Sequence, residues 1–214
     1  MKYKLLKDVI TSIEEFENAV GDNGSKDFAS YKSWLMNDTS YRNVSWEGKD
    51  NGRSADSIIN TLIVHLNRYA KTYSKSVIHK TKFVSQEDFI YLINLRAVGP
   101  MKKSDLIKRN IHEKSPGIQI INRLISNGWI NQIDDEIDKR SKLISLTDEG
   151  EKVLEENMEK IRTATSVVAG RLTEDEKLRL IGLLKKLDEF HLPIYYENKN
   201  PDDLLAYADE LLKK

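Results

Sequence analysis

The chain has 214 residues, of which 39% are hydrophobic and 32% are charged, a balance typical of a globular protein with a real core. Its 34 basic and 34 acidic residues cancel to a formal net charge of zero, which argues mildly against a protein that coats nucleic acid nonspecifically. There is no cysteine, so disulfides, thiolate metal ligands and cysteine nucleophiles are excluded.

Two helices are predicted in the first 50 residues. Residues 4–20 place apolar side chains at helical spacing, and a Gly-rich turn at 21–24 ends this helix. Residues 28–35 carry the apolar stripe of a second, shorter helix. A polar stretch over residues 37–53 predicts a loop. We therefore expect residues 1–52 to form an N-terminal helical extension that pads a dimer interface; the alternative is an aromatic binding surface.

A long helix is predicted next, from about Ser54 to His79. Its apolar stripe is broad, as expected for a helix buried between several neighbours. The following helix has Ser85 as its N-cap. Asp88 occupies the capping-box position three residues later, where Glu or Gln is more usual. Gly99 ends this helix.

Two short helices and a hairpin follow. The second short helix is predicted over residues 115–127, with Ser115 as its N-cap and Pro116 at its first position. Gly128 ends it in a left-handed conformation. An apolar strand, a charged turn and a second apolar strand come next. This order predicts a winged helix-turn-helix over about residues 83–150, whose second helix lies in the major groove of DNA.

Helices are predicted again after the hairpin. Thr147 is the expected N-cap of a long helix, and the last core helix is expected to break at Pro193. We expect a mainly α fold, with flanking dimerisation helices and a small β-hairpin wing. The core domain is predicted over residues 53–192, followed by a C-terminal helical tail at 193–214.

Four short motifs stand out in and around the predicted winged domain. In chain order they are Gly99-Pro100-Met101, Ile121-x-x-Leu124-x-x-x-Gly128-Trp129-Ile130, Asp138-x-Arg140 and Thr147-x-x-Gly150. With these motifs and the helix order around them, residues from about 54 to 190 resemble the MarR family of bacterial transcriptional regulators. The resemblance implies a homodimer whose first and last helices interlock, and which holds two winged domains over a pseudo-palindromic DNA site.

The second short helix is the candidate DNA-reading element. Gln and Asn can pair with adenine, Arg can read guanine or hold a phosphate, and Gly lets the backbone approach closely. Its exposed face and N-terminal end supply the candidate contacts Lys114, Ser115, Gly117, Gln119, Asn122 and Arg123. The alternative is the solvated face of an ordinary helix.

The charged turn of the hairpin is the second candidate contact. The resemblance places Arg140 where the family's wing arginine enters the minor groove, and Asp138 where a carboxylate holds that arginine. Lys139 and Lys142 are expected to neutralise phosphates. The alternative is an exposed hairpin with a surface ion pair worth under about 1 kcal/mol.

A third candidate site lies on the long helix before the winged domain. His65, Tyr69 and Tyr73 recur every four residues there. The resemblance implies an effector pocket between the dimer helices and the winged domain, which these side chains would line. The alternative is a core or dimer contact.

The sequence also predicts absences. No histidine pair has metal-binding spacing, and no P-loop, nucleophile elbow or G-x-G-x-x-G motif occurs. We therefore expect no metal, no cofactor and no enzyme. With no apolar run of 18 residues and no signal-peptide core, we expect a cytoplasmic protein. The leading hypothesis is a homodimeric, sequence-specific transcriptional regulator that responds to a small molecule; the alternative is a winged-helix protein-interaction module without DNA binding.

Overall fold

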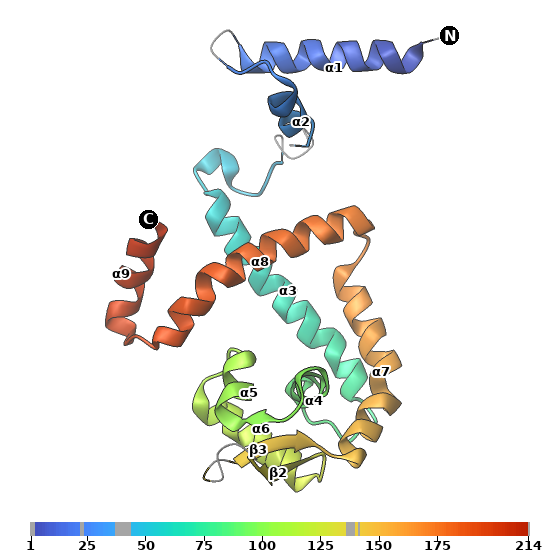
Figure 1. Cartoon of the computed structure of the whole chain (residues 1–214), viewed down its shortest axis with the longest axis vertical. Helices are drawn as coiled ribbons and strands as arrows, with labels where there is room; N and C mark the ends of the chain where they lie inside the picture. Colours follow the sequence, from blue (N-terminus) through green and yellow to red (C-terminus); the bar gives the residue numbers. More distant parts are fainter. Residues whose placement is uncertain (1–2, 22–23, 37–43, 136–139, 141, 214) are drawn as a thin grey trace. The chain divides into compact units, whose positions relative to one another are not determined.

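The computed structural model describes residues 3–21, 24–36, 44–135, 140 and 142–213. The described chain is mainly helical with one small sheet (Figure 1), which confirms the predicted fold class. It forms two compact units that divide between Leu62 and Ile63, inside one long helix. The predicted domain boundary after residue 52 stays a prediction.

The first unit is held together by an aromatic cluster. Phe16 is only 3% exposed, and its ring centroid lies 5.4 Å from that of Tyr31 and 5.8 Å from that of Trp34. These contacts join the two predicted helices, which are both confirmed. The elements of this unit are α1 (Lys4–Val20), α2 (Phe28–Met36), the 3-10 turn η2 (Lys49–Asn51) and the first part of α3 (Ala55–Ile78).

The second unit contains the winged helix-turn-helix. Its three strands are antiparallel in the order β1-β3-β2, with Met101 paired to Ile144 and Ile130 paired to Leu146. The strand β1 was not predicted, because two residues are too few to show alternation. After α3, the elements are α4 (Gln86–Val98), β1 (Met101–Lys102), α5 (Lys103–Arg109), α6 (Lys114–Ser126), β2 (Ile130–Asp134), β3 (Lys142–Leu146), α7 (Asp148–Ala169), α8 (Glu174–Glu197) and α9 (Pro201–Leu212).

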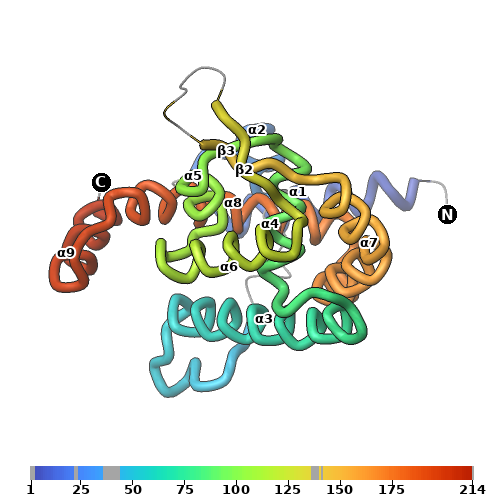
Figure 2. Tube along the Cα trace, turned by 90° about the horizontal axis from the view of Figure 1, so that it is seen from below, coloured from blue at the N-terminus to red at the C-terminus, as the bar shows by residue number. Residues whose placement is uncertain are grey.

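One apolar cluster forms the core of the winged domain. Trp129 is 1% exposed and packs edge-on against Phe83, with ring centroids 5.3 Å apart. Leu106 of α5 and Leu124 of α6 are fully buried in the same cluster. Figure 2 shows α4, α5 and α6 gathered together, with β2 and β3 along one side of them. The removal of this apolar area from water is the main force that fixes α6 in its place.

The Thr147-x-x-Gly150 motif joins the hairpin to α7. The hydroxyl of Thr147 accepts a hydrogen bond from the Gly150 N–H at 3.0 Å, which confirms the predicted N-cap. The same hydroxyl donates to the carbonyl of Gly128 at 2.7 Å. A Cβ on Gly150 would lie 2.0 Å from the Trp129 carbonyl oxygen, so this position requires glycine.

Two predicted helix boundaries are wrong. α6 begins at Lys114 with Glu113 as its N-cap, so Ser115 is not the cap. Pro116 still fits, because the first four N–H groups of a helix have no partner within it. Pro193 does not break α8, which continues to Glu197. The missing proline N–H leaves one carbonyl of the preceding turn without its helical partner. The last turn is anchored by Ile194, which is buried, and by Tyr195, whose hydroxyl donates to the His112 carbonyl.

Candidate nucleic-acid interface

The helix α6 presents one polar face to solvent. Ser115, Gln119 and Asn122 are exposed and recur at helical spacing, so they share this face. Lys114 is exposed at its N-terminal end. The opposite face is buried and carries Gly117, Ile120, Ile121 and Leu124. The structure therefore places four of the six candidate residues of α6 where they are available to a ligand.

Gly117 does not belong to the exposed face, and its predicted position is wrong. It is buried, and a Cβ at this position would lie 2.6 Å from Cγ1 of Ile107 in α5. The glycine therefore allows α5 and α6 to pack closely.

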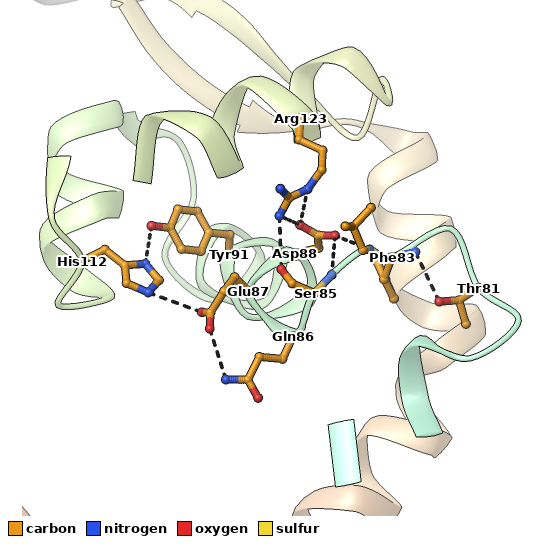
Figure 3. Close-up of polar contacts among 10 residues, drawn as sticks. Thr81, Phe83, Ser85, Gln86, Glu87, Asp88, Tyr91, His112 and Arg123 are labelled. Atoms are coloured by element: carbon orange, nitrogen blue, oxygen red, sulfur yellow. Dashed lines mark hydrogen bonds and ion pairs between the residues drawn. The ribbon is translucent and has the colours of Figure 1, made fainter. Parts of the chain in front are cut away.

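Arg123 also departs from its predicted position, because its side chain turns back into the domain (Figure 3). Its Nε donates to Oδ1 of Asp88 at 2.9 Å, and its Nη2 donates to the hydroxyl of Ser85 at 3.1 Å. Only 29% of the Arg123 side chain is exposed, and none of the Asp88 side chain is. The arginine thus holds α6 against the start of α4.

Asp88 links this ion pair to the cap of α4. Its other oxygen, Oδ2, accepts hydrogen bonds from the N–H groups of Val84 at 2.7 Å and Ser85 at 3.2 Å. The predicted capping box of Ser85 and Asp88 is confirmed. Sequence reasoning found the cap but missed its second role. An Asp in place of the usual Glu or Gln was the signal, because the shorter carboxylate stays close to the helix end and is buried there.

A polar network around His112 holds the turn between α5 and α6. The Tyr91 hydroxyl and His112 Nδ1 share a hydrogen bond of 2.8 Å, and His112 Nε2 lies 3.6 Å from a carboxylate oxygen of Glu87 (Figure 3). The Tyr195 hydroxyl donates to the His112 carbonyl at 2.8 Å. Burial, with the nearby Glu87 charge, raises the pKa of Tyr91, so the phenol stays neutral. This network was not predicted from the sequence, because its members lie far apart in the chain.

The hairpin is described only in part. Lys142 is exposed and forms an ion pair with Asp134 across the two strands. Arg140 is exposed. Asp138 and Lys139 lie outside the described residues, so the predicted pairing of Asp138 with Arg140 stays a prediction.

The proposed effector residues lie along one helix. The rings of His65 and Tyr69 have centroids 6.4 Å apart. Tyr69 is 55% exposed and Tyr73 is 38% exposed. The exposed side chains of Ile63 and Leu66 lie on the same helix, so this region of α3 is an open apolar surface in the single chain.

No helix in the described ranges is long and apolar enough to cross a bilayer. Within the same ranges, no three acidic, histidine or cysteine side chains are grouped in a way that could hold a metal ion.

Comparison with known proteins identifies the domain that carries α6. The family described as "Winged helix DNA-binding domain" matches residues 84–150. The uncharacterized HTH-type transcriptional regulator YwoH from Bacillus subtilis is 30% identical over 127 residues, a match that covers 56% of this chain and 90% of YwoH.

Solved structures share the fold. A variant of MarR from E. coli, in complex with operator DNA, superposes with a TM-score of 0.52 and 22% identity over 67% of this chain and 99% of that chain. BpsR from Bordetella bronchiseptica, whose DNA binding is regulated by 6-hydroxynicotinic acid, gives a TM-score of 0.57 and 21% identity over 64% of this chain and 96% of that chain.

Proposed function

Because the chain belongs to the winged-helix, HTH-type transcriptional regulators and shares the fold of MarR, we propose that two copies of it bind a pseudo-palindromic DNA site. Each copy inserts α6 into a major groove. The observation that carries the proposal is the exposed polar face of α6, on which Gln119 and Asn122 stand opposite a fully packed core. Amide side chains on such a face suit hydrogen bonding to adenine.

The hairpin supplies the second contact in this proposal. Arg140 and Lys142 are exposed on it, and their charges suit the phosphate backbone or a narrow minor groove. Lys139 joins them as a phosphate contact, and Asp138 orients Arg140. The pairing of Lys142 with Asp134 means that DNA must compete with a surface carboxylate, which costs under about 1 kcal/mol.

Dimerisation explains the apolar surface of the second unit. Leu180, Ile181 and Leu184 of α8 are between 37% and 49% exposed, and Ile63 and Leu66 of α3 are 44% and 47% exposed. Exposed apolar side chains concentrated on two helices mark an interaction surface. A second copy of the chain is the natural partner, because a two-fold dimer doubles the number of DNA-reading helices.

Regulation by a small molecule is part of the proposal. A ligand changes DNA affinity only if it binds the two arrangements of the winged domains with different affinity. His65, Tyr69 and Tyr73 would line a site for it once a partner covers them. We further propose that the protein is no enzyme and works in the cytoplasm, where a regulator meets its DNA.

The test is duplex binding. Fluorescence anisotropy of the purified protein, with a labelled duplex from its own upstream region and unlabelled random duplex as competitor, is measured at two salt concentrations. Tight binding that resists the competitor and weakens steeply with salt supports the proposal, because phosphate contacts release counterions. No binding to either duplex at low salt would favour the protein-interaction module instead.

A further inference from the structure

A groove with a volume of about 560 Å³ lies between α5, the start of α6 and the end of α8. Its size suits a small organic ligand. The groove is distinct from the face of α3 discussed above, because it lies beside the base of the DNA-reading helix. The side chains that matter for its chemistry are Lys103, Lys108, Lys114, His112, Tyr195 and Tyr196.

One wall of the groove is apolar and aromatic. Ile107 is 5% exposed at its base, and Ile118 is half-buried beside it. Tyr195 is fixed in position by the hydrogen bond to the His112 carbonyl. Tyr196 is 49% exposed, so its ring is open to a ligand. Such a wall favours a planar, apolar group, because rings stack in offset or edge-on arrangements.

The charge of the groove is positive. Lys103, Lys108 and Lys114 supply three ammonium groups, and Glu113 supplies the one carboxylate of the lining. In the part of the chain that the structure describes, none of these three lysines forms an ion pair with a carboxylate. Three positive charges and one negative charge leave an excess of two.

Lys108 connects the charged part of the groove to its aromatic wall. Its Nζ lies 5.6 Å from the centroid of the Tyr196 ring, a cation–π distance. A ligand whose ring packs on Tyr196 therefore has an ammonium group within reach of a negative substituent.

We propose that this groove binds a small phosphate monoester whose organic part is planar. A phosphate monoester carries a charge of about −1.5 to −2 at pH 7, which matches the excess of two. Lysine binds phosphate well as a point charge. The lining joins α8 to the turn before α6, so an occupied groove fixes the position of α6 relative to α8. Binding itself does not depend on the proposed function; only its effect on DNA affinity rests on that function.

The test uses the full chain and three matched probes. Adenosine 5′-monophosphate, adenosine and ribose 5-phosphate are titrated by isothermal calorimetry in the absence of DNA. We expect one saturable site per chain for the nucleotide. Adenosine lacks the dianion and ribose 5-phosphate lacks the planar ring, so each is expected to bind about tenfold more weakly or worse.

Variants locate the site. Lys108→Gln and Lys103→Gln are each expected to weaken nucleotide binding about tenfold, and Tyr196→Ala is expected to weaken binding of the nucleotide more than that of ribose 5-phosphate. Lys160→Gln, on the exposed surface of α7 outside the groove, is the control and is expected to change nothing. Circular dichroism spectra confirm that each variant is folded.

Three results would overturn the proposal. The first is that the nucleotide shows no saturable binding, and the second is that adenosine binds as tightly as the nucleotide. The third is that the lysine variants weaken duplex binding although the nucleotide does not bind to the protein. The last result would mean that the lysines hold the phosphates of DNA instead. Duplex binding by the unliganded wild-type protein is a separate measurement, so a failure of the proposed function can be told apart from a failure of this site.

Discussion

Removal of the Arg123 guanidinium tests whether this residue positions α6 or reads DNA. In Arg123→Ala, the fully buried Asp88 carboxylate keeps its two backbone N–H donors and loses its one cationic partner among the described residues. Breaking a buried ion pair by removing one partner costs about 3–5 kcal/mol. Because 29% of the Arg123 side chain is exposed, water screens part of this interaction, and we expect a loss of about 2–3 kcal/mol in the free energy of unfolding.

Urea denaturation followed by circular dichroism and tryptophan fluorescence measures this loss. Arg162→Ala, on the exposed side of α7, serves as the matched control and should change the free energy by less than about 0.5 kcal/mol. A double-mutant cycle of Arg123→Ala with Asp88→Ala should show a coupling of about 1–3 kcal/mol, because each side chain loses its charged partner when the other is removed.

Duplex binding distinguishes the two roles of Arg123. A phosphate contact would lower the slope of affinity against salt by about one when removed, whereas a positioning residue leaves that slope unchanged. The reasoning would be refuted if Arg123→Ala kept the wild-type free energy of unfolding and lost both duplex affinity and salt slope.

Three further predictions concern the packing, the titration and the DNA contacts. Gly117→Ala should lower the free energy of unfolding by about 1–3 kcal/mol, since its Cβ would press on Ile107; a neutral result in urea denaturation would contradict this packing. Burial raises the pKa of Tyr91, so the contribution of the neutral phenol to stability is complete below pH of about 10 and is lost as the pH rises towards the folded-state pKa. Tyr91→Phe should therefore remove part of the fall in stability at alkaline pH. An unchanged dependence of the free energy of unfolding on pH would contradict this role of Tyr91. Gln119→Ala should cost about 1–3 kcal/mol of specific duplex binding and relax the sequence preference. Equal losses of affinity on operator and random DNA would show that Gln119 reads no base. Arg140→Ala should reduce the slope of affinity against salt by about one if Arg140 holds a phosphate.

Sequence pattern was sufficient for the order of the helices and of the two hairpin strands, but not for the short strand β1. Hydrophobic periodicity and capping residues located the helices to within a few residues, because both signals are local. Ser85 and Thr147 were recognised as caps for this reason. The predicted helix end at Pro193 was wrong, because a proline ends a helix only when the residues around it do not stabilise the next turn.

The directions in which side chains point could not be predicted from the sequence pattern. Gly117 and Arg123 have the polar or small character of surface residues, yet one fills a close contact and the other reaches a buried carboxylate. Both facts depend on residues of other helices, Ile107 of α5 and Asp88 of α4. A helical wheel places a Cα on a face, but the path of a long side chain depends on the partner it finds.

The hydroxyl of Thr147 couples the winged domain to α7, so that the two move together. It joins the end of α6, through the Gly128 carbonyl, to the first turn of α7, through the Gly150 N–H. The hairpin leaves and re-enters the domain at this joint. A tilt of α7, which leads towards the proposed dimer helix α8, therefore turns the DNA-reading helix and the base of the wing together. In the proposed dimer, the spacing between the two DNA-reading helices would then depend on the angle of α7, and the proposed ligand could release the DNA by changing this angle without contacting the bases.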